Sequence, residues 1–535
     1  MATRPTFSPS PIHSPRKPEP ALLARARQVL GQTAMDRFVV VGLVVIAAVL
    51  RFVNLPTRGT WDADQGHDML VLRSFVRVGE VPLLGPPTSI GDFHHGVLYY
   101  YLLAPAAALT GANPVGVVAA IALAGVAAVA VTWWLARSIG GPVAGLVAGI
   151  LMAVSASAVD ESTFIWNPNL IALSSSIALA AAWRAWTTRR AGWWIVAAAG
   201  VVVTMHCHVL GTALMPPVAA LLLADARRRQ SGGERSAALR AGLVGLGLLV
   251  VSYIPLVIHE LGSDFSEARA AIDFISGGGE ASGVSLPVRM VIVGWRVLAW
   301  PLAGLVTDVP TVALLAAMLV VGFAVWRAIA AQGEERTAVR WLGAALAWTI
   351  VALTFAASGL ATVIPGLPND HYHAFADPIV FVVVGLGVAT LASRQPLGTA
   401  IAVVLVVLIG AYNVSRLPPA TAPDGGWPAA QVAAARILAV TPPGQAIALE
   451  SLPVFKAPDA IGFPLVAAGA TVTREGEDGA TSGPLVVLCD ELFEEAIGAA
   501  CDGPAEDAAV SGQALELADR FEAAPGRWVS VYLPC

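Results

Sequence analysis

Charged residues are scarce in this sequence. Lys, Arg, Asp and Glu make up 13% of its 535 residues, whereas hydrophobic residues make up 56%. Soluble globular proteins carry roughly 25% charged residues, so this composition predicts an integral membrane protein. The net charge is only −5, and the sequence has no basic block with interleaved aromatic residues, which excludes a nucleic-acid-binding protein.

Cysteine is also rare, with four residues in the chain. This number is too small for a disulfide scaffold. Cys489, Cys501 and Cys535 all lie in the more polar C-terminal part. A single bridge can form there, and the spacing leaves its pairing open.

The N-terminal region lacks the apolar core of a cleavable signal peptide. Residues 1–34 are rich in Pro, Ser and Arg and predict a disordered cytosolic tail. The first apolar run, residues 38–53, is therefore predicted to be a retained membrane span, with Arg37 and Arg51 at its two interfaces.

Basic residues collect in alternate connections between the apolar runs. Because short loops rich in Lys and Arg stay in the cytosol, these connections are predicted to be cytosolic: 137, 184–190, 227–240, 327–340 and 394. The remaining connections are predicted to face outward: 56–96, 160–169, 205–209, 259–287 and 358–378. The two sets are compatible only if segments 97–110 and 288–306 do not cross the membrane.

Each of these two segments has a reason not to cross. Segment 97–110 has about 14 residues, so as a helix it reaches roughly 21 Å, against a hydrocarbon core of roughly 30 Å. Segment 288–306 contains Pro301 and Arg296, and an Arg in mid-span costs roughly 2.5 to 3.5 kcal/mol. We therefore expect about eleven transmembrane helices, or thirteen if both segments cross.

The predicted fold class is an all-α polytopic membrane bundle over residues 35–416, with a small outward-facing α/β domain over residues 417–535. The evidence for the second domain is a set of short segments bounded by Gly and Pro, predicted as strands at 446–449, 485–488 and 528–533 and a helix at 491–500. Frequent Ala, Gly, Val and Arg fit a bacterial plasma-membrane protein.

Histidines and carboxylates gather on the predicted outer side. Of nine histidines, only His13 lies in the predicted cytosolic tail. The first outward loop, residues 56–96, places Asp62, Asp64 and Asp68 within seven residues, directly after the first span. Such a group is either a general-base and cation-binding cluster or a solvated loop, and the neighbouring Trp61 favours a shaped, functional loop.

The motifs of this loop resemble those of the GT-C membrane glycosyltransferases related to protein O-mannosyltransferases and to lipid A aminoarabinose transferases (glycosyltransferase family 39). Asp64-Gln65-Gly66 corresponds to their first Asp-Glu-Gly motif, and His95-Gly96-Val97-Leu98-Tyr99-Tyr100 to the stretch that ends their first loop. Gln65 departs from the usual Glu. The resemblance extends over residues 51–194 and includes Trp166-Asn167-Pro168-Asn169.

The resemblance implies an enzyme that moves a hexose or pentose from a polyprenyl-phosphate carrier to a glycan, lipid or protein acceptor in the cell envelope. It implies Asp64 as the general base, with Asp62 as a second candidate for base or cation ligand. The absence of a nucleotide-phosphate loop from the sequence agrees with a lipid-phosphate donor. A lipid phosphate requires positive partners, and the candidates for contacts to the donor phosphate are His94, His95, Arg73 and Arg296. Further substrate-binding candidates are Tyr99, Asp160, Asn167, His371 and His373.

Several readings stay open at this point. Arg296 either binds the donor phosphate or snorkels to lipid headgroups, and Asp160 either contacts substrate or ends a helix. His206 and His208 form a weak His-x-His pattern, so no cofactor is firmly predicted and a divalent cation is left open. The competing function is a transporter of a polar or lipid-linked solute. A third class is a receptor or assembly subunit that binds a partner through its C-terminal domain.

Overall fold

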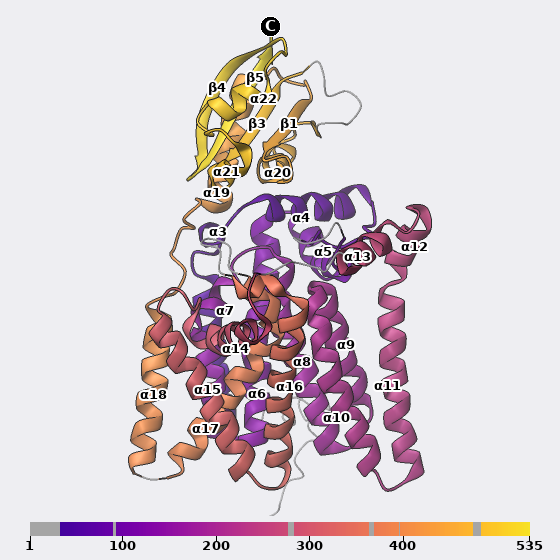
Figure 1. Ribbon diagram of the computed structural model, residues 1–535, viewed down its shortest axis with the longest axis vertical. Coiled ribbons are helices and arrows are strands. Elements are labelled where there is room, and N and C mark those ends of the chain that lie inside the picture. Colours follow the sequence, from indigo (N-terminus) through magenta and orange to yellow (C-terminus); the bar gives the residue numbers. More distant parts are fainter. Residues whose placement is uncertain (1–32, 89–92, 277–282, 363–368, 395, 475–482) are drawn as a thin grey trace, which may run out of the picture.

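The protein consists of a helical bundle with a smaller sheet-containing domain seated on one of its ends (Figure 1). This computed structural model describes residues 33–535 except 89–92, 277–282, 363–368, 395 and 475–482. The predicted disordered tail, residues 1–34, falls almost entirely outside the described residues. We call the end of the bundle that carries the C-terminal domain the domain end.

The long helices of the bundle coincide with the predicted spans. They are α2 (Ala34–Phe52), α6 (Pro114–Val154), α8 (Ile171–Thr188), α9 (Gly192–Cys207), α10 (Met215–Arg228), α11 (Gly232–Ser252), α15 (Pro310–Ala330), α16 (Gly333–Ala356), α17 (Asp377–Ala392) and α18 (Leu397–Val414). Within the described ranges, nine helices are long and apolar enough to cross a membrane. The total of eleven spans and the cytosolic N-terminus stay predictions.

Helix α6 is two helices joined at a kink. Its 41 residues would reach roughly 60 Å if straight, about twice the hydrocarbon thickness. The chain turns at Gly141, whose φ of 83° is open to glycine, and Pro142 follows. This turn lies in the predicted cytosolic connection after Arg137.

Shorter elements cover the domain end and connect the long helices there. At the domain end the chain forms α3 (Leu55–Arg58), α4 (Ala63–Arg73), η1 (Ser74–Val78), α5 (Leu98–Thr110), α7 (Ala156–Asp160), η2 (Asn167–Leu170), η3 (Val209–Leu214), α12 (Ile254–Gly262), α13 (Ser266–Ser276), η4 (Ser358–Ala361) and η5 (Asp370–Ala376). Helix α5 has 13 residues, which leaves it too short to span, as predicted.

Helix α14 (Leu286–Ala303) lies across the bundle, although its length and composition would allow it to span. Three positions along it contact the same end of other helices: Arg289 donates to Thr354 O at 3.2 Å, Arg296 donates to Leu360 O at 2.9 Å, and Leu302 O accepts from Asn413 at 2.8 Å. In Figure 1 it is seen nearly end-on beside upright helices. The predicted non-crossing position of segment 288–306 agrees with these contacts.

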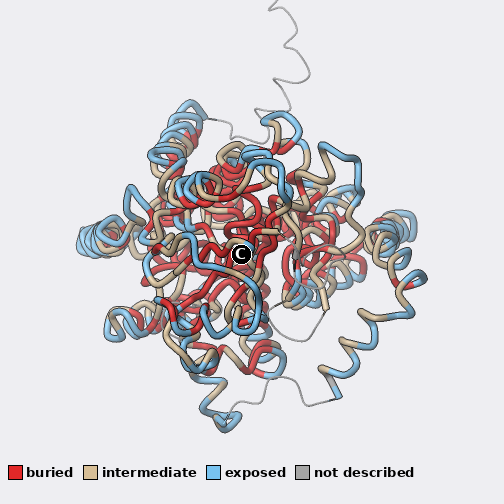
Figure 2. The backbone as a smooth tube through the Cα atoms, turned by 90° about the horizontal axis from the view of Figure 1, so that it is seen from above, coloured by how far each residue is buried: buried red, intermediate tan, exposed pale blue. Residues whose placement is uncertain are grey.

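Many apolar side chains remain exposed around the outside of the bundle. Only 11% of the most apolar window of Gly232–Gly262 and 17% of that of Leu397–Val414 are buried. Figure 2 shows buried chain in the middle and exposed chain on the peripheral helices. Exposed apolar faces of this extent are expected where lipid, not water, surrounds the helices.

Arg51, which was predicted to lie at a membrane interface, is enclosed by other parts of the protein. Its side chain is completely buried and donates to Met152 O at 3.3 Å, Ala153 O at 3.1 Å and Ser162 Oγ at 3.1 Å. The last carbonyls of a helix have no partner within the helix, and a basic side chain can satisfy them. Arg51 therefore closes the end of α6 in the interior.

The C-terminal domain contains a five-stranded mixed sheet. Its elements are α19 (Gly426–Val440), β1 (Ile447–Leu452), α20 (Asp459–Ala467), β2 (Val472–Arg474), β3 (Leu485–Asp490), η6 (Glu491–Phe493), α21 (Glu494–Ile497), α22 (Pro504–Ala509), β4 (Leu515–Ala524) and β5 (Arg527–Pro534). The strand order is β2-β1-β3-β5-β4, with β1 parallel to β2 and β3 and the other pairs antiparallel. The three predicted strands are confirmed as β1, β3 and β5.

Two details of this domain differ from, or complete, the sequence prediction. The predicted helix at 491–500 is shorter, because η6 and α21 end at Ile497, before the left-handed Gly498. The single bridge joins Cys489 at the end of β3 to Cys501, and Cys535 is free and exposed.

Candidate active site

The first outward loop contains α4, which begins at the acidic motif. Asp62 is the N-cap: its carboxylate accepts from the backbone N–H of Ala63 at 2.6 Å, and its own N–H donates to Gln65 Oε1 at 2.8 Å. The Gln65 amide also donates to Ile165 O at 2.8 Å. A carboxylate could accept the first bond but could not donate the second, so this contact accounts for Gln65 in place of the usual Glu.

Asp62 is held by two cations of the C-terminal domain. Its carboxylate lies 3.1 Å from Lys456 Nζ and 2.8 Å from Arg527 Nη2. Burial alone would raise the pKa of Asp62, but Arg527 and Lys456 outweigh it and hold the pKa below its usual value. An ionised carboxylate occupied by two cations is a poor proton acceptor, so Asp62 is suited to holding α4.

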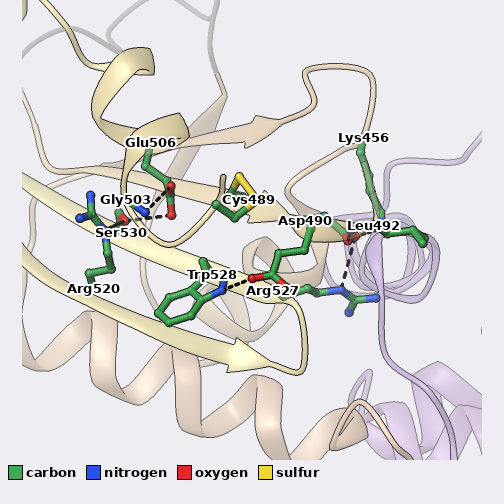
Figure 3. The surroundings of a disulfide bond; sticks show 12 residues. Lys456, Cys489, Asp490, Leu492, Gly503, Glu506, Arg520, Arg527, Trp528 and Ser530 are labelled. Atoms are coloured by element: carbon green, nitrogen blue, oxygen red, sulfur yellow. Dashed lines mark hydrogen bonds and ion pairs between the residues drawn. A yellow bond between two sulfur atoms is a disulfide. The ribbon is translucent and has the colours of Figure 1, made fainter. Parts of the chain in front are cut away.

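Lys456 and Arg527 share a second carboxylate within the C-terminal domain. Lys456 also pairs with Asp490, and Arg527 Nε lies 3.7 Å from it. Figure 3 shows Lys456, Asp490 and Arg527 pointing toward one another beside the disulfide. In addition, Arg527 donates to the backbone carbonyl of Trp61 at 2.8 Å. The domain thus grips the start of α4 through both side-chain and backbone contacts.

Asp64 differs from its neighbours because it is exposed although protein surrounds it closely. Desolvation by this surrounding protein raises the pKa of Asp64, and the charge of Asp62 acts in the same direction. His67, Lys456 and a hydrogen bond from Trp166 act in the opposite direction, but the net pKa stays raised. A reachable carboxylate with a raised pKa has the properties of a general base.

Asp68 is the buried member of the cluster. Its carboxylate accepts the hydroxyls of Tyr99 and Tyr100, both at 2.8 Å. Burial raises its pKa to about 7. These bonds join α4 to α5, and Tyr99 is completely buried. The structure therefore gives Tyr99 a packing contact where a substrate contact was predicted.

The two histidines that end the first loop contact other parts of the protein. His94 Nδ1 lies 2.9 Å from Glu267 Oε1 on α13, and the backbone N–H of His94 donates to Glu267 Oε2 at 2.7 Å. His95 Nδ1 accepts from the N–H of Val209 at 3.3 Å. Burial lowers the pKa of His95 to about 4. At neutral pH it is therefore uncharged, and the expected cationic contact to phosphate would have to be a neutral hydrogen bond.

A row of rings in tilted and edge-to-face contact leads from Asp64 to His95. We call Trp166, His371, His208 and His95 the aromatic row. The ring centroids lie 4.2 Å apart for Trp166 and His371, 5.4 Å for His371 and His208, and 4.8 Å for His208 and His95. The row brings together four separate segments of the chain, including the second motif of the first loop, and its Trp166 end bonds to Asp64 of the first motif. The predicted residues His95 and His371 meet in it.

Two other predicted substrate contacts lie in the packing between helices. Asn167 is buried and donates to Cys207 O. Arg296 is also buried; it binds both oxygens of Asp370 at 3.0 and 2.6 Å and donates to the carbonyls of Leu360 and Thr362, each at 2.9 Å. Because Arg296 is enclosed in protein, it does not reach lipid headgroups, and snorkelling is excluded.

His373 lies beside Asp370 in the buried ion pair with Arg296, whereas Asp160 lies at the surface. His373 Nε2 lies 3.1 Å from Asp370 Oδ1 and is buried. Asp160 is exposed at the end of α7, and desolvation by the surrounding protein raises its pKa to about 6, with Arg58 acting against the shift. Asp160 is thus a second reachable carboxylate at the domain end.

The His-x-His pattern does not assemble with the acidic cluster. His206 Nε2 lies 2.8 Å from Ser252 Oγ, and His208 belongs to the aromatic row. Among the described residues, no group of three or more His, Cys, Asp or Glu side chains is arranged to hold a metal ion.

Residues 94–254 match the protein family described as dolichyl-phosphate-mannose-protein mannosyltransferase. Among solved structures, ArnT from Cupriavidus metallidurans bound to undecaprenyl phosphate aligns over 92% of this chain and 97% of its own, with 16% identity and a TM-score of 0.62. The oligosaccharyltransferase of Archaeoglobus fulgidus, in complex with Zn and sulfate, aligns over 85% of this chain and 68% of its own, with 12% identity and a TM-score of 0.50. No curated protein matches the chain in sequence.

The chain has the fold of these membrane proteins, and about a third of it resembles the mannosyltransferase family in sequence. The family match begins at His94 and therefore includes the His95-Gly96 motif but not Asp64. The assignment of Asp64 as a reachable carboxylate therefore comes from its geometry alone.

The sequence did not point to several residues of the candidate site. Lys456, Arg527 and Glu267 lie far along the chain from their partners, and only folding brings them together. Trp166 was noted as part of a motif but not as a neighbour of Asp64. A tryptophan next to Asn-Pro-Asn in a predicted outward turn was the one local signal available.

Proposed function

We propose that this protein is a glycosyltransferase. It moves one hexose or pentose from a polyprenyl-phosphate carrier to a hydroxyl group of an envelope glycan, lipid or protein on the extracytoplasmic side of a bacterial plasma membrane. The observation that carries the proposal is Asp64, an exposed carboxylate with a raised pKa between the C-terminal domain and the bundle. The bound undecaprenyl phosphate of the similar ArnT structure supports a lipid-phosphate donor.

In this reaction the acceptor O–H gives its proton to Asp64 while its oxygen attacks the anomeric carbon of the sugar. A new bond from that carbon to the acceptor oxygen forms as the bond to the phosphate oxygen breaks, and polyprenyl phosphate leaves with the electron pair. A single displacement of this kind inverts the anomeric configuration. A raised pKa brings the base nearer to neutrality, where proton transfer is most effective.

The location of the reachable acids argues against the transporter alternative. Transporters place their main charges within discontinuous spans near the membrane centre. Asp64 and Asp160 instead lie in α4 and at the end of α7, outside the helices that could span. Solute flux in proteoliposomes without sugar transfer would favour the transporter.

The test is sugar transfer from a panel of radiolabelled polyprenyl-phosphate monosaccharides by the purified protein. Asp64→Asn should abolish transfer and leave the thermal unfolding temperature unchanged or slightly higher, because the replaced group has a raised pKa. Asp264→Asn is the matched control, since Asp264 is an exposed acid whose ion pair with Arg269 lies on the surface. Full activity of Asp64→Asn would exclude it as the base.

A further inference from the structure

A cavity of about 370 Å³ lies between the outer part of α4 and the C-terminal domain. Its apolar wall includes Leu70 and Val78 on one side and Leu449 and Val466 on the other. Pockets that bind small molecules have volumes of roughly 300 to 1,000 Å³ and combine apolar walls with a few polar groups. This cavity has that size and composition.

Arg73 is the cation of this cavity. It is half-buried in the last turn of α4 and has no acidic or hydrogen-bonding partner among the residues that the structure describes. The acid that also lines the cavity, Asp459, is buried and pairs with His67 at 3.1 Å. A partly desolvated guanidinium without a counter-ion favours binding of an oxyanion, often through two parallel hydrogen bonds.

The cavity is separate from the position of Asp64. Arg73 follows Asp64 by nine residues on the same helix, which corresponds to roughly 14 Å along its axis. Leu70 and Arg73 face the C-terminal domain, whereas Asp64 approaches Trp166 of the bundle. In the proposed function the lipid donor approaches Asp64 from the membrane, which leaves the cavity on the domain side for the other substrate.

We infer that this cavity binds an anionic group of the acceptor through Arg73. This inference rests on the proposed function and makes it more specific: the acceptor is an elongated molecule whose phosphate or carboxylate lies at least about 14 Å from the hydroxyl that receives the sugar. It also changes the role expected for Arg73, which was a donor-phosphate contact in the sequence prediction.

The test measures binding without any transfer. Radiolabelled glucose 1-phosphate and glucuronate represent the two oxyanions, glucose is the uncharged control, and equilibrium dialysis of the detergent-solubilised full chain gives their affinities. Loss of a charge-assisted contact should weaken binding of at least one oxyanion by about tenfold to a hundredfold in Arg73→Gln. Arg73→Lys should retain part of the affinity.

Two further variants separate binding from misfolding. Arg77→Gln is the matched control, because Arg77 lies one turn further on and donates to Gly111 O at 3.0 Å outside the cavity; its affinity should equal that of the wild type. Val466→Phe fills the cavity from the opposite wall and should also weaken binding. Thermal unfolding checks that each variant is folded.

Unchanged oxyanion affinity in Arg73→Gln would overturn the inference, as would no oxyanion binding by the wild type. Either result leaves the proposed function standing, because Asp64-dependent transfer is measured separately. Conversely, oxyanion binding lost in Arg73→Gln and Val466→Phe would stand even if none of the lipid-linked donors were used.

Discussion

The contact between Asp62 and the C-terminal domain predicts how firmly α4 is held. Replacing Lys456 by Met removes one of the two cations that meet the Asp62 carboxylate and keeps the aliphatic part of the side chain. The other cation, Arg527, remains at 2.8 Å. The change therefore weakens the grip on α4 without leaving Asp62 unpaired.

The magnitude follows from how exposed the partners are. The side chains of Lys456 and Asp62 are 19% and 31% exposed. Exposed ion pairs contribute about 0 to 1 kcal/mol, and loss of one partner of a fully buried pair costs about 3 to 5 kcal/mol. An intermediate cost of about 1 to 3 kcal/mol corresponds to a factor of about 5 to 150 in the local opening equilibrium of α4.

Hydrogen–deuterium exchange of peptides covering Ala63–Arg73 measures this opening equilibrium. Lys456→Met should accelerate exchange there by the factor above. Arg436→Met is the matched control, since the ion pair of Arg436 with Asp519 at 2.6 Å lies within the C-terminal domain. Equal exchange of α4 in wild type and Lys456→Met would refute the reasoning, as would equal acceleration by both variants.

The same variant should change the pH dependence of transfer. Lys456 lowers the pKa of Asp64, and Asp62 raises it. Without Lys456 the pKa of Asp64 rises further, so the fraction of ionised base at a given pH falls. The acid limb of the pH–rate profile should therefore move to higher pH, and a shift to lower pH would contradict this electrostatic account.

Three further predictions concern stability. Arg296→Met leaves Asp370 buried without its main cation and should lower the free energy of unfolding by about 3 to 5 kcal/mol, measured by thermal denaturation in detergent. The pKa of Asp160 is raised from 3.8 to about 6. The contribution of protonated Asp160 to folding stability is therefore complete below pH 3.8 and is lost as the pH rises through about 6. Asp160→Asn should gain stability relative to wild type above about pH 6. Replacing Cys489 and Cys501 by Ser should destabilise the C-terminal domain by about 2 to 4 kcal/mol, measured by limited proteolysis.

Matched controls exist for these three measurements. Arg269→Met removes an exposed ion pair and should cost less than about 1 kcal/mol. Cys535→Ser changes a free, exposed cysteine and should leave proteolysis unchanged. For Asp160, an identical stability difference at low and high pH would show that the pKa shift is not responsible.

Hydropathy and charge predicted most of the bundle because these patterns are local. The positions of the basic connections predicted that the segment with Arg296 and Pro301 does not cross the membrane. The corresponding helix, α14, lies across the bundle as expected. The polarity of the C-terminal region similarly predicted strands β1, β3 and β5. In each case the information lies within one segment and its immediate neighbours.

The site was predicted less completely because its contacts join distant segments. Asp64 could be named from its motif, but the partners of Asp62, Lys456 and Arg527, lie in the C-terminal domain and leave no local pattern. His95 was expected to offer charge to a phosphate, but burial lowers its pKa to about 4. Motif position indicates which residues gather in a region, whereas burial decides what state of charge they have there.

Gly66 of the acidic motif lies in close contact with the C-terminal domain. A Cβ atom at this position would lie 1.9 Å from the backbone oxygen of Asp459 on α20, so any side chain would push the C-terminal domain away from α4. The glycine of the Asp-Gln-Gly motif is thus required by the neighbouring domain and not by the chemistry of Asp64. In proteins of this fold that lack such a domain, we expect this position to accept larger residues, so its identity would indicate from sequence alone whether a domain is seated on the helix.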